Sequence, residues 1–346
     1  MATQLTDSAW PEWIAGLMRV GPRRTLTAAL PPGRFHCLLD ELPLHLIPAH
    51  GLHRARELFR RPLFLNPDCC LQSCGELPAE LEPHRDLLQN FDLQGTVVWV
   101  RDPALSFPHP FCLGPRLHSL VEHLPPGERL ADAVRPEDLQ LLAQAGILTT
   151  AEQRELHRAE WADLAERGGR EFREKNYFPV PNLIHPFQIA ALRRYYRHEI
   201  RRGAIRLGDY QSSRRYVAHN ESVARFFHLQ IANAVATIVG EPVKPSYVYL
   251  ASYLSGAELK KHTDREQCEF SVTLCLDFAP EPALATPWPI RLDTPEGTVT
   301  GYQALGDGLV YRGTKVPHYR SPLPEGFTST SIFFHYVPQD FTGTLN

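Results

Sequence analysis

His262 and Asp264 stand two residues apart, directly before a segment whose residues alternate like those of a β-strand, "EFSVTLCLDF". On an extended chain, residues two apart point to the same face. An imidazole and a carboxylate on one face are two of the ligands that a divalent metal ion takes in proteins. The pattern therefore predicts a metal site whose third ligand arrives from a distant strand.

His318 is the best candidate for that third ligand. It lies in "GDGLVYRGTKVPHYR", near the end of a predicted strand, in a segment that opens with a Gly-Asp turn. Two histidines and one carboxylate form a facial triad, which binds iron(II) on one side and leaves further positions open for other ligands. We therefore predict His262, Asp264 and His318 as metal ligands and as the catalytic centre.

Several segments of the chain resemble a known family in their order. "SYLSGAELKKHTD", "GDGLVYRG", "PHYR" and the closing "SIFFHYV" are similar to segments of the iron(II)- and 2-oxoglutarate-dependent oxygenases with a double-stranded β-helix, or jelly-roll, core, in the prolyl-hydroxylase-like superfamily. The resemblance covers roughly Asn182 to Val337. It implies iron(II) as cofactor, 2-oxoglutarate and oxygen as cosubstrates, and ascorbate as a reductant.

The resemblance also implies the reaction. Related halogenases lack the carboxylate ligand, whereas this chain has Asp264, so hydroxylation of an unactivated C–H bond is the expected outcome. The alternative is a chance His-x-Asp pattern in a non-catalytic, cupin-like binding module.

The family needs a basic residue for the distal carboxylate of 2-oxoglutarate. In many members it is an Arg on the strand after the last His, with a Ser two residues further on, and here that register falls on Thr328 and Thr330. Arg320 shares the face of His318 on a strand, so we expect it to replace the missing Arg.

Other assignments for the cosubstrate contacts stay open. A surface residue at a strand end is the alternative interpretation of Arg320, and Arg312, which has the same parity, is the second candidate. We expect the hydroxyl of Thr330 and the phenol of Tyr253 to help bind the same carboxylate, although Tyr253 also suits an aromatic core position.

The chain divides into three predicted parts. Residues 1–150 read as an N-terminal α+β domain, residues 151–181 as a charged helical connector broken at Gly168-Gly169, and residues 182–346 as the oxygenase jelly roll. Two helices are expected to back the jelly roll. One starts at Pro186, and the other follows Asn220 as N-cap and ends at Gly240.

The N-terminal domain shows two short helical patterns, one around residues 117–124 and one from Pro136 to Gly146. Together with the closing "GIL" they resemble a winged-helix module, of either the peptide-recognition or the DNA-binding kind. A packing domain without a ligand explains the pattern equally well.

The bulk composition limits the partners. The net charge is −3, so no basic surplus favours nucleic acid or an anionic membrane. No signal peptide or membrane span is visible, which predicts a cytoplasmic protein. The expected substrate is an amino-acid side chain in a peptide or protein, or else a free amino acid or small metabolite. The sequence indicates no oligomeric state.

The cysteines carry no metal signature. Cys69, Cys70 and Cys74 form the only cluster, and no second pair follows them. Cys268 and Cys275 fall in the predicted strand region and are expected to be small core residues.

Overall fold

The computed structural model describes residues 32–48, 62–73, 75–130 and 134–345, and the chain from Pro32 onward forms one compact unit. Cys74 and residues 1–31, to which the signal-peptide prediction applies, lie outside the described residues.

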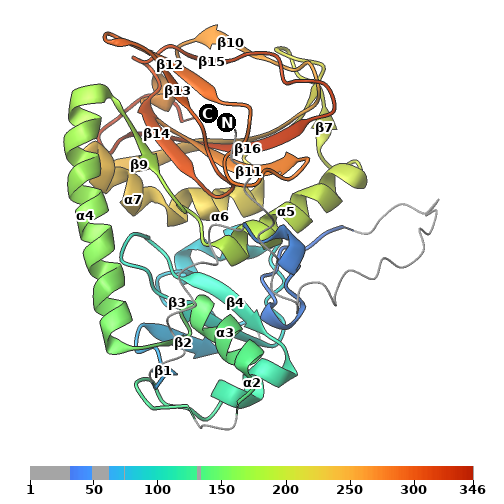
Figure 1. Ribbon diagram of the computed structural model, residues 1–346, viewed down its shortest axis with the longest axis vertical. Helices are drawn as coiled ribbons and strands as arrows, with labels where there is room; N and C mark the ends of the chain where they lie inside the picture. The colour runs from blue at the N-terminus through green and yellow to red at the C-terminus, as the bar shows by residue number, and fades with distance from the viewer. Residues whose placement is uncertain (1–31, 49–61, 74, 131–133, 346) are drawn as a thin grey trace, which may run out of the picture. The chain divides into compact units, whose positions relative to one another are not determined.

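Eight strands of the C-terminal half wind between two antiparallel sheets, whose facing residues pack together (Figure 1). The larger sheet has the order β6-β14-β11-β16-β9-β8-β7, and the smaller has the order β10-β15-β12-β13. This winding is the predicted jelly roll. The eight strands are β9 (Val243–Tyr253), β10 (Leu259–His262), β11 (Phe270–Ala279), β12 (Ile290–Thr294), β13 (Gly297–Gly301), β14 (Gly308–Arg312), β15 (His318–Arg320) and β16 (Thr328–Pro338).

Strand alternation separates two environments across the larger sheet. On β16, Ile332 and Phe334 pack into the core shared with the helices, whereas Phe333 packs with residues of the jelly-roll interior such as Trp288. Every second residue of a strand in this sheet therefore faces inward, between the two sheets.

Three helices cover the outer face of the larger sheet: α5 (Pro186–Arg201), α6 (Ser222–Gln230) and α7 (Ala232–Val239) (Figure 1). Among the described residues, no single helix is long and apolar enough to cross a membrane, and only α6 with α7, bent by 44° at their junction, meet that test as a pair.

The expected N-cap at Asn220 is wrong. The carboxylate of Glu221 caps α6 instead, by accepting a hydrogen bond from the backbone N–H of Ala224 at 3.0 Å. Asn220 has φ 51° and its side-chain oxygen accepts from the N–H of Val248, which ties the loop to β9. Gly240 ends α7 in the left-handed conformation, as expected.

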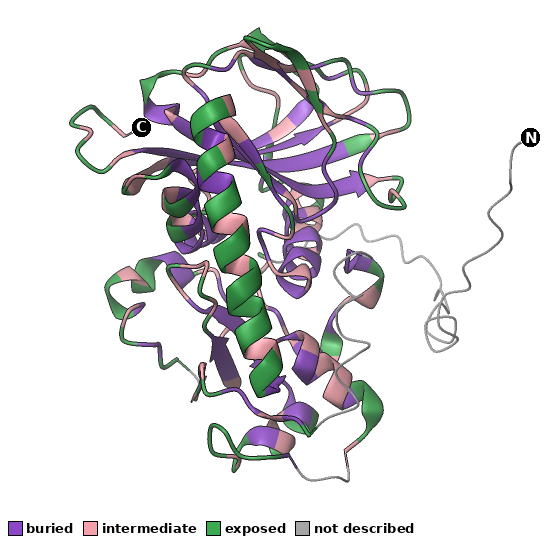
Figure 2. Ribbon diagram, turned by 60° about the vertical axis from the view of Figure 1, so that its left-hand side comes forward, coloured by how far each residue is buried: buried purple, intermediate pink, exposed green. Residues whose placement is uncertain are grey.

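The predicted break at Gly168-Gly169 is also wrong, because α4 (Ala151–Lys175) runs through both glycines. A Cβ atom on Gly168 would lie 2.9 Å from the Phe178 ring on β6 (Tyr177–Val180). Glycine is therefore needed for close packing rather than for a break. Most of α4 is exposed or half-buried (Figure 2).

The N-terminal part is α+β, as predicted. It contains a three-stranded sheet and a two-stranded sheet. Its elements are η1 (Leu39–Glu41), η2 (Leu44–Leu46), β1 (Phe64–Leu65), β2 (Cys69–Gln72), η5 (Glu82–Leu88), β3 (Thr96–Val100), β4 (His109–Leu113), α2 (Pro115–Val121), α3 (Pro136–Gln144) and β5 (Leu148–Thr149). The domain limits at residues 150 and 181 and the winged-helix resemblance stay predictions.

The remaining short elements are β7 (Arg206–Leu207), β8 (Arg215–His219) and η6 (Glu266–Cys268). Among the described cysteines all are free, and Cys268 and Cys275 are buried, as expected.

Arg193 on α5 joins the N-terminal part to the jelly roll. Its side chain is fully buried and donates hydrogen bonds to the carbonyl of Leu46 at 2.6 Å and to Asp277 on β11 at 2.8 Å. It also pairs with Glu281. One guanidinium therefore satisfies acceptors from both parts of the chain.

We predict that Arg193→Ala lowers the free energy of unfolding by about 3 kcal/mol, the lower end for breaking a buried ion pair, because Arg197 still pairs with Asp277. Urea unfolding followed by circular dichroism measures the change. Arg201→Ala, an exposed position on the same helix, is the control, with an expected change within about 0.5 kcal/mol. Equal effects of both substitutions would refute the joining role.

Candidate active site

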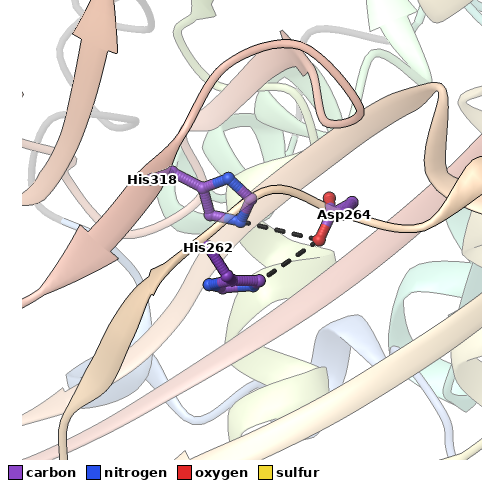
Figure 3. Close-up of side chains that lie close together, drawn as sticks. All are labelled: His262, Asp264 and His318. Atoms are coloured by element: carbon purple, nitrogen blue, oxygen red, sulfur yellow. Dashed lines mark ion pairs between the residues drawn. The ribbon is translucent and has the colours of Figure 1, made fainter.

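His262, Asp264 and His318 meet at one end of the smaller sheet (Figure 3). His262 ends β10, His318 begins β15, and the two residues are direct partners in the antiparallel register. Their ring centroids lie 4.4 Å apart. Asp264 follows in the loop, where its Oδ1 lies 3.6 Å from Nε2 of each histidine.

The hydrogen bonds of the two histidines fix their tautomers. Nδ1 of His262 donates to the carbonyl of Lys260 at 2.7 Å, and Nδ1 of His318 donates to the carbonyl of Val316 at 3.0 Å. A carbonyl only accepts, so the proton stays on Nδ1 and the lone pair stays on Nε2. Burial also lowers the pKa of His318, which favours the neutral ring.

Asp264 is held just as specifically. Its Oδ2 accepts a hydrogen bond from the hydroxyl of Ser271 at 2.8 Å, so Oδ1 is the oxygen that faces the histidines. The Ser271 hydroxyl is also 2.9 Å from Nδ1 of His335, which is buried on β16. A Cβ atom on Gly313 would overlap Asp264 Oδ2 and the Ser271 hydroxyl, so only glycine leaves room for this arrangement.

A second group of ligand-type side chains, Asp264, Cys268 and His335, shares Asp264 with the first. Burial raises the pKa of the Cys268 thiol to about 12, and the Tyr247 hydroxyl lies 3.1 Å from its sulfur. A protonated thiol is a poor metal ligand. His335 helps to position Ser271, because its Nδ1 lies within hydrogen-bonding distance of the Ser271 hydroxyl.

This donor set fits a divalent metal ion. Nε2 of both histidines and one carboxylate oxygen lie within 4.8 Å of one another, while the second atom of each group is taken by a protein partner. Such outer hydrogen bonds orient ligands in metal sites.

Arg320 lies in the jelly-roll interior on the same strand as His318. It is 4% exposed, donates to the carbonyl of Trp288 and to Oε1 of Gln303, and lies 4.8 Å from the centre of the Trp288 ring. Its Nε has no partner, and no carboxylate of the described part of the chain pairs with it. A buried cation without an anion is unfavourable, so this interior fits a ligand that carries a carboxylate.

Three neighbouring polar residues escaped the sequence reasoning. Gln303 joins Arg320 to the carbonyl of Thr273, to which it donates at 2.8 Å. The hydroxyl of Thr273 is fully buried without a partner, and the hydroxyl of Tyr311 lies 3.4 Å from Nε2 of His318. Alternation along β11 and β14 could have indicated Thr273 and Tyr311. Gln303 lies outside the strands, and no local signal marks it.

Tyr253 also lies on this inner side. Its hydroxyl accepts a hydrogen bond from Arg215 at 3.3 Å, and its ring centre is 5.1 Å from that of Trp288, the ring under Arg320. Arg215 is paired with Asp209, so its charge is already neutralised.

Two expected contacts do not reach this interior. Thr330 shares the helix-facing side of β16 with Ile332, and its hydroxyl donates to Ser252 at 2.8 Å, so its assignment to the cosubstrate is corrected. The reason is parity, because the inward residues of β16 are its neighbours. Arg312 pairs with Glu269 at 3.0 Å and lies over the ring of Phe270, on the side of the helical core.

Comparison with solved structures finds 2-oxoglutarate-dependent oxygenases. The carbocyclase SnoK from nogalamycin biosynthesis, described as non-heme and alpha-ketoglutarate-dependent, is 11% identical over 54% of this chain and 88% of its own, with a TM-score of 0.45. A prolyl-4-hydroxylase from Pseudomonas putida is 14% identical over 51% of this chain and 100% of its own, with a TM-score of 0.42. EctD from S. alaskensis is 14% identical over 50% of this chain and 76% of its own, with a TM-score of 0.42. No protein-family model and no curated protein matches the sequence.

We predict that His262→Ala and His318→Ala each abolish stoichiometric binding of iron(II), because each removes one of three ligands. Anaerobic titration calorimetry with iron(II) measures this. His123→Ala, which changes a histidine whose side chain is 91% exposed, is the control and should bind like the wild type. Retained stoichiometric binding in both ligand variants would disprove this metal site.

Ser271→Ala should weaken iron(II) binding by roughly 10–100-fold, the usual effect of losing an outer hydrogen bond to a metal ligand. The same titration tests it. Ser252→Ala removes a hydroxyl from the helix-facing side of the same sheet and should leave the affinity unchanged. The idea fails if both variants bind iron(II) with wild-type affinity.

Proposed function

We propose that this protein is an iron(II)- and 2-oxoglutarate-dependent dioxygenase that hydroxylates an unactivated C–H bond. The observation that carries the proposal is the juxtaposition, on one short strand, of His318 from the donor triad and Arg320, a buried cation without an anionic partner. Two imidazoles and a carboxylate suit iron(II), and the neighbouring guanidinium suits the carboxylate of a 2-oxo acid. The site therefore matches iron(II) bound together with a 2-oxo acid.

His262, Asp264 and His318 would hold iron(II), and Arg320 would hold the distal carboxylate of 2-oxoglutarate. When bound, these groups and oxygen supply the oxidation, in which one oxygen atom enters the substrate and the other enters succinate, with loss of carbon dioxide. Protein residues do the orienting, since both imidazoles and the carboxylate are fixed by their outer hydrogen bonds.

Nearby side chains of the interior would complete the cosubstrate site. The buried hydroxyl of Thr273 has no partner and Tyr311 places its hydroxyl beside His318, so both can donate to a bound carboxylate. Tyr253 and Trp288 close the other side of Arg320 and exclude water from it. Exclusion of water strengthens the pairing of a guanidinium with a carboxylate.

The proposed substrate is an amino-acid side chain in a peptide or protein, in a cytoplasmic setting, with residues 1–150 as a recognition domain. A free amino acid or small metabolite is the alternative that keeps the same chemistry. A non-catalytic binding module is a third reading. Succinate release that depends on oxygen and iron(II) separates the two enzyme readings from the binding module.

Arg320→Ala should raise the KM for 2-oxoglutarate at least about a hundredfold, because losing a buried pairing partner costs about 3 kcal/mol or more and each 1.4 kcal/mol is about tenfold. Succinate release measured against 2-oxoglutarate concentration gives the value, and iron(II) binding should stay intact. Arg320→Lys should restore only part of the loss, because lysine lacks the guanidinium fork.

Arg312→Ala is the matched control, since Arg312 already pairs with Glu269 outside this interior. Its KM should stay near that of the wild type. A large rise in the Arg312 variant, with none in the Arg320 variant, would move the cosubstrate to a different cation.

A further inference from the structure

A second cation without an anionic partner stands directly beside the donor triad. Arg265 follows Asp264 in the chain, is exposed, and places its guanidinium over the ring of Tyr247, 4.8 Å from the centroid. No carboxylate in the described ranges pairs with it, because the oxygens of Asp264 face the histidines and Ser271, and Glu266 makes no ion pair with it. Its charge is therefore available to a ligand from solution.

The wall under Arg265 is ordered by packing. Tyr247 is 8% exposed, its hydroxyl contacts Cys268, and its ring lies 4.6 Å from that of His335 and 5.1 Å from that of His219. The ring of His219 is stacked on it with an interplanar angle of 28°. A guanidinium resting on a fixed ring loses little freedom when it binds an anion.

Strands β8 and β9, which carry His219 and Tyr247, contain no carboxylate. Asp209, from the loop before β8, is engaged by Arg215 and by the hydroxyl of Tyr249 at 2.6 Å. Arg215 and Asp209 neutralise each other, so exposed Arg265 is the cation of this wall that an anion from solution can reach. Arginine suits carboxylate and phosphate groups because its fork matches their geometry.

We propose that the substrate of this site carries an anionic group, a carboxylate or a phosphate, that pairs with Arg265. This inference rests on the proposed function and names its substrate class. In this assignment, buried Arg320 binds the cosubstrate and exposed Arg265 binds the substrate. Arg265 is thus a specificity-determining residue rather than a catalytic one.

The test measures binding of matched probe pairs to full-length protein loaded with zinc(II) in place of iron(II) and with 2-oxoglutarate. Each free amino acid is paired with its primary amide, and each small phosphate monoester with its parent alcohol, so that one member of each pair lacks the anionic group. Ligand-observed NMR gives the affinities, and the two sets of pairs distinguish carboxylate from phosphate substrates.

We expect the wild type to bind a probe that carries the anionic group and to discriminate against the partner that lacks it. Arg265→Gln should weaken binding of that anionic probe by about tenfold to a hundredfold, the range for a lost charge-assisted hydrogen bond, and leave the partner without the anionic group unaffected. Lys261→Gln is the control, because Lys261 is paired with Asp293 and lies over Tyr319, and should bind as the wild type does.

Three results would overturn the inference: no anionic probe binds, partners without the anionic group bind as well as the probes that carry it, or Arg265→Gln weakens binding of 2-oxoglutarate instead of the probe. Oxygen-dependent succinate release by the iron(II)-loaded wild type without any probe is measured alongside. This assay tests the proposed function independently of the probes. If succinate is released but the probe results contradict the inference, the proposed function is retained and the substrate class is rejected.

Discussion

The antiparallel pairing of β10 with β15 is the constraint on which the site depends. It places His262 directly opposite His318, and the loop after β10 then brings Asp264 within 3.6 Å of both rings. A shift of one residue in this register would turn one histidine to the outside of the sheet, because successive strand residues face opposite ways. The same pairing places Arg320 two residues beyond His318, facing the interior.

Orientation at the site comes from neighbours that are not ligands themselves. Backbone carbonyls two residues before each histidine fix the two rings, and Ser271 fixes the carboxylate. Gly313 leaves the space in which that carboxylate lies. These contacts belong to strands of both sheets, so the geometry of the donor atoms depends on how the sheets face each other. This links the packing of the jelly-roll core to the chemistry proposed for its open end.

Much of this arrangement could be predicted from the sequence where the signal is local. The His-x-Asp spacing indicated two ligand candidates on one face, and the resemblance to a known family implied the jelly roll. The orientation of Thr330 could not be predicted in this way, because the face of β16 that turns inward depends on the helices behind the sheet. Gln303 shows a second limit, since a loop residue has no periodicity that marks it. Gly168 shows a third, because packing against Phe178 decides whether this glycine breaks the helix or lets it approach the sheet.

Arg320 and Arg265 have no carboxylate partner among the described residues. Arg193 and Arg215 are also buried, but each has a carboxylate partner, Asp277 and Asp209 respectively, and each supports the fold. Arg320 is buried without such a partner, and a folded protein tolerates that cost when a ligand supplies the missing charge. Arg265 is exposed, so water solvates its charge until an anion binds and no desolvation cost arises. With the proposed assignments, burial would favour a tightly held cosubstrate at Arg320 and exposure an exchanging substrate at Arg265.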